Sequence, residues 1–275
     1  MTFSIGWYKN EWLDIDNILI TANDRGLKFG DGIFETILIK EKKPILFKEH
    51  IKRLENSSKL LNINLKINTL NLEKVINEGI KKLSLKNDQI GSVRINYSRG
   101  TSIARSLKIN NYLQNNGLDN LWLEFYKIKP NFNPISVCIS ETEKRNEFSL
   151  ISKCKTFSYN QAIKVLCEAN QKSFDDSLLL NTSGELCCGS TFNLLIKRNN
   201  KWITPRKESG CLEGIMIDKV LELKIAEEEL IFPDFKNDDI LVAINSLSCR
   251  QINKVNNLKL RKVFDPIYFW DLLYN

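Results

Sequence analysis

The chain has 275 residues, 43% of them hydrophobic, which is enough for one large domain or two smaller ones with a real core. Its net charge of +7 comes from 40 basic and 33 acidic residues without a dense basic block, so we interpret the charges as solvated surface and not as a nucleic-acid site. No basic-then-apolar signal pattern opens the chain, and no apolar run approaches the ~20 residues that span a bilayer. The sequence therefore predicts a soluble cytoplasmic protein that binds neither nucleic acid nor membrane.

The cysteine pattern favours reduced thiols. The seven cysteines, at positions 138, 154, 167, 187, 188, 211 and 249, are odd in number and lack CxxC spacing. The chain also has a single histidine and no paired ligand spacing, so we expect no metal site.

The first half of the chain alternates between strand and helix patterns. Period-two alternation predicts a strand over 33–40, and apolar residues at helical spacing predict helices over 47–61 and 72–83. Strands are expected at 91–97 and 121–128, and the polar, Asn-rich stretch 100–117 is expected to be a loop. These elements form the expected first domain, residues 1–128.

The segment 129–134 contains two of the six prolines, which block regular structure, and is the best linker candidate. Beyond it we expect a second domain over 135–275. Its strands are predicted at 135–140, 177–181, 192–197, 201–204 and 239–244, and its helices at 158–172 and 215–226. Mixed strands and helices in both halves predict an α+β or α/β protein of two domains.

Two segments of the first half could carry chemistry. Within 24–36, Gly26, Gly30 and Gly32 lead into a strand, which suits either a tight turn or close backbone approach to a ligand. His50 and Arg53 share one helix face. Such a pair is usually a surface feature, but an arginine aimed inward would suit a phosphate, because its planar fork bonds two oxygens at once.

Two segments of the second half are also candidates. Lys155 stands just before a predicted helix; most lysines are solvated, but a buried one is a nucleophile for aldehydes. The segment 213–216 opens another predicted helix, where free backbone N–H groups can bind an anion. Most helix starts bind only water, so neither feature is decisive alone.

Taken together, the order and spacing of these segments, from about residue 20 to residue 255, resemble the class IV aminotransferase family. That family includes branched-chain aminotransferases, D-amino acid aminotransferases and aminodeoxychorismate lyases. The resemblance implies a two-domain fold-type IV architecture with pyridoxal 5'-phosphate bound between the domains. It also implies a homodimer in which part of each active site is supplied across the interface, and a small-molecule amino substrate.

The resemblance assigns cofactor roles in the middle of the chain. Lys155, which lies 38 residues before Asn193, resembles the Schiff-base lysine and the general base of the reaction; Lys153 is a rival that fits the spacing less well. Tyr159 resembles a tyrosine near the cofactor. Arg53 resembles the arginine that holds the cofactor phosphate.

Two turns complete the expected cofactor site. Gly214, Ile215 and Met216 resemble the turn whose backbone amides bind the phosphate. Asn245 and Ser246 resemble a second phosphate-binding turn after the predicted strand 239–244.

The chain departs from the family pattern at Cys188, where a glutamate normally stands five residues before the matched Asn193 and keeps the pyridine nitrogen protonated. Glu185 is a poor substitute, because three residues along a strand cover about 10 Å and reverse the side-chain face. A thiol, with an ordinary pKa near ~8.5, would hold a ring proton less well than a carboxylate. The departure therefore predicts a weaker electron sink at the cofactor ring than in other members of the family.

For the substrate, the candidates are Thr36, Arg99 and Arg105. The segment 98–105 resembles the Arg-Gly-x-x-x-Arg pattern of the lyases and D-amino acid enzymes, with one extra residue before Arg105. The alternative interpretation is that Arg99 and Arg105 are simply basic residues of a mobile loop. We favour 4-amino-4-deoxychorismate lyase, which releases pyruvate and 4-aminobenzoate for folate synthesis. An amino acid aminotransferase of the D-amino acid or branched-chain type, and a catalytically weakened pyridoxal-phosphate-binding protein, are the alternatives.

Overall fold

The computed structural model describes residues 4–102, 106–109 and 120–274. The chain divides into two compact units. Unit 1 contains Met1–Lys129 and Cys154–Ser158, and unit 2 contains Pro130–Lys153 and Tyr159–Asn275. The short segment that carries Lys155 therefore belongs to unit 1, whereas the domain bounds expected from the sequence assign it to the C-terminal domain.

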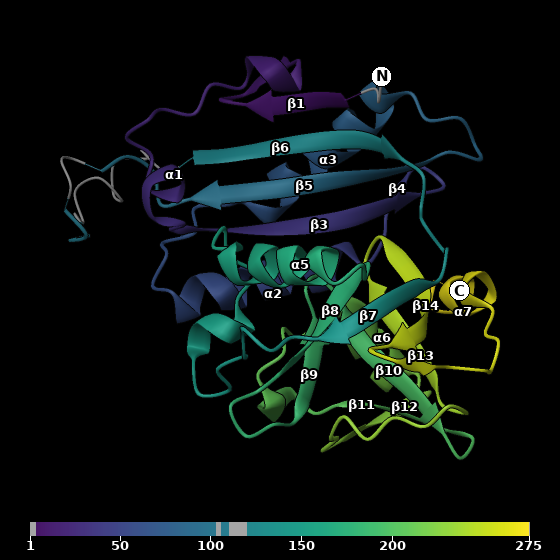
Figure 1. Cartoon of the computed structure of the whole chain (residues 1–275). Helices are drawn as coiled ribbons and strands as arrows, with labels where there is room; N and C mark the ends of the chain where they lie inside the picture. The colour runs from purple at the N-terminus through teal and green to yellow at the C-terminus, as the bar shows by residue number, and fades with distance from the viewer. Residues whose placement is uncertain (1–3, 103–105, 110–119, 275) are drawn as a thin grey trace. The chain divides into compact units, whose positions relative to one another are not determined.

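Over the described residues, unit 1 contains a six-stranded sheet in which all neighbouring strands are antiparallel (Figure 1). The strand order is β2-β1-β6-β5-β3-β4. The strands are β1 (Ser4–Tyr8), β2 (Glu11–Leu13), β3 (Gly32–Lys40), β4 (Lys43–Pro44), β5 (Ile90–Ser98) and β6 (Asn120–Ile128). Because side chains alternate along a strand, one face of this sheet is apolar and the other carries polar and aromatic groups.

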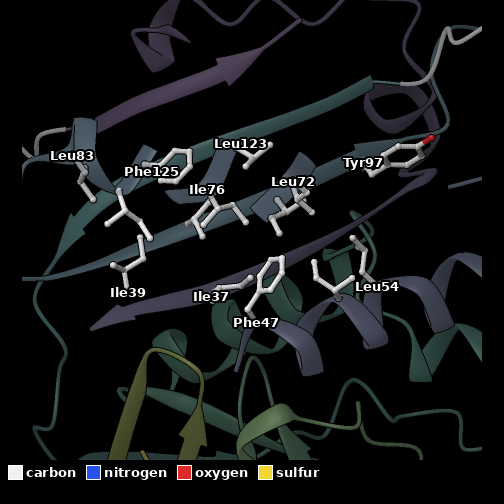
Figure 2. Packing of buried hydrophobic residues seen from close by; sticks show 14 of the residues in the cluster. Ile37, Ile39, Phe47, Leu54, Leu72, Ile76, Leu83, Tyr97, Leu123 and Phe125 are labelled. Carbon is white, nitrogen blue, oxygen red and sulfur yellow. The ribbon is translucent and has the colours of Figure 1, made fainter. Parts of the chain in front are cut away.

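Helices cover the apolar face of this sheet. The described helices of unit 1 are α1 (Arg25–Phe29), α2 (Phe47–Leu60), α3 (Thr69–Leu83) and the 3-10 turn η1 (Ile15–Asn17). Asn68 caps α3 by accepting the Asn71 N–H at 3.1 Å. Figure 2 shows the resulting core, in which apolar residues of α2 and α3 pack on those of β3, β5 and β6. This core leaves the opposite, polar face of the sheet available for chemistry.

Unit 2 contains a nine-stranded sheet over the described residues, ordered β12-β11-β10-β13-β14-β7-β8-β9, with β15 paired to β14. The strands are β7 (Ile135–Ile139), β8 (Asp176–Leu180), β9 (Leu186–Gly189), β10 (Asn193–Arg198), β11 (Lys201–Pro205), β12 (Ala226–Glu229), β13 (Ile240–Asn245), β14 (Ser248–Val255) and β15 (Leu258–Lys259). The pairs β7–β8, β7–β14 and β11–β12 are parallel. Parallel neighbours need a crossover, and helices supply it.

The helices of unit 2 are α5 (Asn160–Gln171), α6 (Ile215–Glu222) and α7 (Pro266–Leu272), with 3-10 turns η2 (Leu150–Lys153) and η3 (Lys207–Ser209). Helix α5 precedes β8, and α6 joins the parallel strands β11 and β12 (Figure 1). None of the helices within the described residues is both long and apolar enough to cross a membrane.

The mixed α/β class expected from the sequence is confirmed, as are the strands and helices of the first half and the absence of regular structure over 129–134. One predicted helix is longer than the helix that the structure contains. The helix expected over 215–226 ends at Glu222, because Ala226 begins β12 and pairs with Trp202 of β11. The elements that were not expected are the strands β1, β2, β4, β9, β12, β14 and β15 and the helices α1 and α7.

Candidate active site

Lys155 is held against the first residues of β3. The Phe34 N–H donates to the Lys155 carbonyl at 3.0 Å, and the Phe157 N–H donates to the Gly32 carbonyl at 3.0 Å. Thr156 forms an antiparallel bridge with Ile33 between these two bonds. Residues 155–157 thus add a short strand to one edge of β3, which fixes the backbone on which the lysine side chain stands.

The glycine-rich segment makes room for this addition. A Cβ at Gly32 would overlap the Phe157 ring, and one at Gly26 would lie 2.9 Å from it. Asp24 caps α1 by accepting the Gly26 N–H at 2.8 Å, and it also accepts the Ser98 hydroxyl at 2.6 Å. The segment 24–36 therefore holds the Phe157 ring in place, two residues after Lys155 in the chain.

The Lys155 side chain lies on the polar face of the unit 1 sheet. Its Nζ is 4.4 Å from the centroid of the Phe34 ring, and the Arg94 guanidinium is 3.5 Å from the same centroid. In the sheet register, Thr36 stands opposite Arg94 and Phe34 stands opposite Asn96. The lysine, the arginine and the predicted substrate contact Thr36 therefore share one side of the sheet.

A buried ionic cluster lies on the other face of β3. Glu35 is fully buried and accepts two N–H bonds from Arg53, each 2.7 Å long, in a two-pronged pair. His50 Nδ1 lies 2.7 Å from the second Glu35 oxygen. The sequence placed His50 and Arg53 on one helix face, and the structure shows that this face meets the Glu35 carboxylate.

The charge states in this cluster follow from its contacts. Burial opposes ionisation of Glu35, but the charge and hydrogen bonds of Arg53, together with the hydrogen bond from His50, lower the pKa of Glu35 to about 2. Burial lowers the pKa of His50 below 6.5, against the pull of Glu35. We therefore describe His50 as neutral, donating its Nδ1–H to an ionised Glu35 that Arg53 balances.

Arg99 is buried at the end of β5. Its Nε donates to both oxygens of Asp31 at 2.9 and 3.0 Å, and its two terminal nitrogens donate to the carbonyls of Leu61 and Asn62. Arg99 thus satisfies backbone carbonyls at the end of α2, which favours a structural role for it. Arg105, the other expected carboxylate contact, lies outside the described residues.

In unit 2, the first turn of α6 presents backbone amides without a side-chain cap. Gly214 is the N-cap residue, and no described side chain accepts a capping hydrogen bond there. A Cβ at Gly214 would overlap Asn193 Oδ1, and Asn193 Nδ2 donates to the Leu212 carbonyl at 2.9 Å. Glycine therefore lets β10 approach the helix start, where the amides of Ile215 and Met216 lack partners within the helix.

The turn between β13 and β14 is fixed by Asn245. Its Oδ1 accepts the Leu247 N–H at 2.9 Å and the Ser248 hydroxyl at 3.1 Å, and its Nδ2 donates to the Thr191 carbonyl at 3.2 Å. The Tyr274 hydroxyl donates to the Ser246 carbonyl at 3.4 Å. Asn245 and Ser246 thus form a constrained turn, with side-chain and backbone groups held in place.

Cys188 belongs to a buried cluster of three thiols with Cys187 and Cys211. A bulge between Leu179 and Leu180 of β8 leaves Cys187 as an extra residue in β9. The Cys187 thiol donates to Cys188, which lowers the pKa of Cys188, and the same contact raises the pKa of Cys187. The position at which the family pattern has a carboxylate thus contains hydrogen-bonded thiols.

Glu185 has other partners. It accepts a 2.7 Å bond from Arg206 and a 2.9 Å bond from the Ser209 hydroxyl. These bonds hold its carboxylate within unit 2. Tyr159 is the N-cap residue of α5, and its carbonyl accepts the Ile163 N–H at 2.9 Å.

A model of the family described as amino-transferase class IV matches residues 32–255 of this chain. The chain belongs to the class IV aminotransferase family. It is 24% identical over 243 residues to a protein of Methanocaldococcus jannaschii provisionally named a branched-chain-amino-acid aminotransferase, covering 86% of this chain and 82% of the relative.

Solved structures share the fold. A protein of Legionella pneumophila, provisionally assigned as a 4-amino-4-deoxychorismate lyase, has a TM-score of 0.79 at 24% identity and covers 94% of each chain. An aminotransferase of Brucella abortus bound to pyridoxal phosphate has a TM-score of 0.84 at 16% identity and covers 100% of each chain. The fold-type IV architecture expected from the resemblance is therefore confirmed. Class IV aminotransferases use pyridoxal phosphate, so this chain is a pyridoxal-phosphate-dependent enzyme.

The residues of this class IV enzyme fit the cofactor in two respects. The uncapped first turn of α6, tightened by the contact between Gly214 and Asn193, suits a phosphate group. Lys155 presents its amine beside an aromatic ring on a backbone that two hydrogen bonds fix. The chain differs from the family pattern at Cys188, where a glutamate was expected as the partner of the ring nitrogen.

Glu35, Phe34, Arg94 and Phe157 were not among the residues expected from the sequence. Glu35 had a detectable signal, because it occupies the same side of the predicted strand as Ile33 and Ile37, both fully buried. A charge in the apolar register of a strand indicates a buried partner. The contacts of Arg94 and Phe157 join segments that are far apart in the chain, and no local sequence pattern indicates them.

Proposed function

We propose that this enzyme is a 4-amino-4-deoxychorismate lyase, which releases pyruvate and 4-aminobenzoate. The observation that carries the proposal is the polar sheet face beside Lys155, on which the Arg94 guanidinium and Thr36 stand opposite each other. A substrate with carboxylates matches an arginine, whose fork pairs with two oxygens. An aliphatic branched side chain offers a guanidinium no hydrogen-bond acceptor.

The roles that we propose follow the family pattern. Lys155 binds the cofactor covalently through Nζ, and Tyr159 and Cys188 lie beside the cofactor ring. Arg53 supplies positive charge toward the phosphate, held in orientation by its two bonds to Glu35. The amides of Gly214, Ile215 and Met216 and the turn at Asn245 and Ser246 bind the phosphate oxygens. Thr36 contacts the substrate, and Arg105 is kept as a second candidate.

When bound, pyridoxal phosphate withdraws electrons from the substrate carbon next to the amine. The chain's own part is to place and move a proton. Lys155 Nζ, standing on the strand fixed to β3, would accept the proton from that carbon, and this proton would end on the enolpyruvyl group that leaves as pyruvate while the substrate ring becomes aromatic. Phe34 and Phe157 keep an apolar surface next to the amine and limit the access of water to it.

An amino acid aminotransferase is the second candidate. Several curated relatives, among them proteins of Methanocaldococcus jannaschii and Aquifex aeolicus, carry branched-chain aminotransferase names. A branched-chain specificity predicts turnover of leucine with 2-oxoglutarate, and a D-amino acid specificity predicts turnover of D-alanine with the same acceptor.

Borohydride reduction of the purified protein, followed by peptide mass mapping, tests the cofactor assignment. We expect a phosphopyridoxyl adduct on Lys155. An adduct on Lys153 would move the nucleophile by two residues. The absence of any adduct after adding pyridoxal phosphate would contradict the assigned roles.

A substrate panel tests the reaction. The protein is assayed with aminodeoxychorismate for pyruvate and 4-aminobenzoate, and with D-alanine or leucine plus 2-oxoglutarate for amino transfer. We expect release of 4-aminobenzoate. Turnover of leucine or D-alanine alone would replace the lyase by the aminotransferase, and an adduct without any turnover would favour the catalytically weakened protein.

Three broader features are part of the proposal. A lyase of this kind would act in folate synthesis in the cytoplasm, and the family resemblance implies a homodimer. Light scattering of the purified protein checks the dimer, because it measures a mass that can be compared with the 31.9 kDa chain.

A further inference from the structure

Three thiols of unit 2 meet in one buried cluster. Cys187 and Cys188 are neighbours in β9, and Cys211 lies between η3 and α6, later in the chain. All three are buried, free cysteines. The roles proposed above use only Cys188, so the other two thiols have no assigned task.

A bulge in β9 brings the two neighbouring thiols to the same side. Adjacent residues of a regular strand point to opposite faces of the sheet. In β9, however, the register with β8 shifts after Cys188 pairs with Leu179, and Cys187 is an extra residue. Such a bulge re-aims a side chain. Cys187 thereby packs in the same cluster as Cys188, together with Cys211.

Cys187 is the thiol that both others reach. Hydrogen bonds to Cys188 and to Cys211, followed by burial, raise the pKa of Cys187. The hydrogen bond from Cys187 lowers the pKa of Cys188, and Cys211 does not contribute to that shift. Cys211 is therefore the neighbour of Cys187 from outside the strand, and the pair joins two segments of unit 2.

The segment that carries Cys211 is held beside the start of β9. The Glu185 carboxylate accepts hydrogen bonds from Arg206 at 2.7 Å and from the Ser209 hydroxyl at 2.9 Å. The Cys211 sulfur in turn lies 3.9 Å from the Arg206 carbonyl oxygen. Residues 211–214 form neither helix nor strand, so the backbone at Cys211 can shift while Glu185 keeps the segment beside β9.

A disulfide requires only a small movement from this arrangement. The two sulfurs of a disulfide are about 2.05 Å apart, whereas side-chain atoms in contact are roughly 4 Å apart, so one sulfur must move by about 2 Å. Strand β9 is the terminal strand of the described sheet, and Cys211 stands on irregular backbone. Both partners can therefore supply part of the movement.

We propose that Cys187 and Cys211 form a reversible disulfide when a peroxide is present, and that this bond draws the segment 211–214 toward β9 and weakens cofactor binding at the start of α6. The bond itself is independent of the proposed function, whereas its effect on the cofactor rests on that function. In a reducing compartment such disulfides are usually transient and sense the redox state. The pair thus makes cofactor binding responsive to oxidants.

The oxidation balances with one peroxide molecule. The Cys211 sulfur attacks a peroxide oxygen, the O–O bond breaks, and one water leaves with the thiol proton, which makes Cys211 a sulfenic acid. The Cys187 sulfur then attacks this sulfur, the S–O bond breaks, and a second water leaves with the Cys187 proton. The two thiols together lose two electrons, which the peroxide accepts. Two molecules of a low-molecular-weight thiol reverse the bond by exchange and leave as their own disulfide.

The consequence for the cofactor follows from the place of Cys211 in the chain. It shortly precedes Gly214, the N-cap residue of α6. The Leu212 carbonyl, next to Cys211, accepts the Asn193 Nδ2–H at 2.9 Å and thus links this segment to β10. A shift of Cys211 toward β9 strains that bond and moves the first amides of α6. Loss of one hydrogen bond to a charged phosphate lowers the affinity roughly tenfold.

The test follows the disulfide in the cofactor-loaded enzyme. The protein is treated with hydrogen peroxide, the remaining thiols are alkylated in denaturant, and the peptides are mapped by mass spectrometry without reductant. We expect a Cys187–Cys211 link that a phosphine reductant removes. Cys138 and Cys249 are internal controls, because both are buried but lie outside the three-thiol cluster, and they should be recovered as alkylated thiols.

Variants separate this pair from the third thiol. Cys187→Ala and Cys211→Ala should each abolish the link, whereas Cys188→Ala and the matched control Cys249→Ala should retain it. The affinity for pyridoxal phosphate, titrated through cofactor absorbance, should fall roughly tenfold on oxidation of the wild type and return on reduction. In Cys211→Ala, peroxide should leave this affinity unchanged.

Each outcome decides one step. Absence of the link in the wild type, or a link that includes Cys188 in its place, would overturn the inference, and neither result depends on a variant that folds. A link without any change in cofactor affinity would refute the effect on the cofactor. The Lys155 adduct is measured in parallel on the reduced wild type. Its absence defeats the proposed function and leaves the Cys187–Cys211 link standing.

Discussion

Two buried polar clusters of this enzyme handle charge in opposite ways. In unit 1, the carboxylate of Glu35 is fully buried and ionised, with Arg53 as its counter-charge and His50 as a second donor. In unit 2, Cys188 stands where the family pattern has a carboxylate, and its neighbours Cys187 and Cys211 are thiols. The unit 1 cluster stabilises an ionised carboxylate, whereas the unit 2 cluster contains thiols, which can remain neutral.

The difference follows from the partners that each cluster can offer. A buried charge is tolerated when an opposite charge and hydrogen bonds surround it. In unit 1 the helix α2 carries Arg53 onto β3, and this condition is met. In unit 2 the nearby guanidinium of Arg145 donates to the Gly210 and Ser152 carbonyls and to Gln161. A thiol at Cys188 therefore avoids the desolvation cost that a carboxylate would bring there.

The comparison also separates the two proposed ways of holding a phosphate. Unit 1 offers a side-chain charge, Arg53, whose orientation depends on Glu35. Unit 2 offers backbone amides at the start of α6, whose orientation depends on the close contact between Gly214 and Asn193. Substitutions in the Arg53–Glu35 pair should therefore have effects that depend on charge and pH. Substitutions at the start of α6 should instead act through packing.

The largest expected effect is that of Glu35→Ala. Removing the carboxylate leaves the Arg53 guanidinium mostly buried without its counter-charge, which should cost about 3–5 kcal/mol of unfolding free energy. Urea unfolding measures the change. Glu49→Ala, on the exposed side of the same helix, is the control and should change the free energy by less than about 1 kcal/mol. Similar losses of unfolding free energy in the two variants would mean that the buried Glu35–Arg53 pair stabilises the protein no more than an exposed carboxylate does.

Acid should weaken unit 1 through the same carboxylate. Its pKa is about 2 in the folded state against 4.5 for the unperturbed group, so its contribution is complete above pH 4.5 and is lost as the pH falls toward 2. The shift corresponds to about 3 kcal/mol. His50 adds a loss below 6.5, because burial lowers its pKa and the unfolded chain then binds the proton first.

Urea midpoints of the wild type and of Glu35→Gln, measured from neutral pH down to about pH 3, check this expectation. The wild type should lose more stability than the variant between pH 4.5 and 3, since only the wild type has this carboxylate to protonate. Parallel pH profiles would place the acid-sensitive groups elsewhere.

Local patterns predicted the elements that bury a regular face. The strand at β3 and the helices α2 and α3 have strong apolar periodicity, and their bounds were expected within a few residues. Strand β14 was not expected, because only Cys249, Ile252 and Val255 of its eight residues are buried and polar residues separate them. It forms because β13 and β7 pair with it on either side, which is information from distant parts of the chain.

The candidate site shows the same limit. The order and spacing of several segments, through their resemblance to the class IV family, pointed to Lys155, Arg53 and the start of α6. The contacts that orient these groups were not predictable, since Glu35 meets Arg53 across 18 residues and the backbone of Lys155 bonds to Phe34 of β3, far earlier in the chain. Arg99 illustrates the converse: a sequence pattern suggested a substrate contact, and the structure places the residue between Asp31 and the end of α2.

Gly214→Ala should have an intermediate effect through packing. The added Cβ would overlap Asn193 Oδ1, so β10 and the start of α6 must move apart, at a cost of about 1–3 kcal/mol. The affinity for pyridoxal phosphate should fall together with stability, and the loss should be independent of pH. Gly184→Ala is the control for the glycine change, because its Cβ meets nothing within 4 Å, although its positive φ makes it mildly unfavourable. Unchanged cofactor affinity in Gly214→Ala would remove the start of α6 from the proposed phosphate site.

Cys188→Ala should have the smallest effect. It deletes one sulfur from a packed cluster and breaks no ion pair, so we expect a loss of about 1 kcal/mol that is the same at pH 5 and pH 8. The comparison with Glu35→Ala is then direct: both changes truncate a buried side chain to the same residue, and only one leaves a charge behind. If Cys188→Ala instead costs several kcal/mol more at pH 8 than at pH 5, the thiol is ionised in the folded protein. Arg145 would then be its counter-charge, and unit 2 would bury charge by the same rule as unit 1.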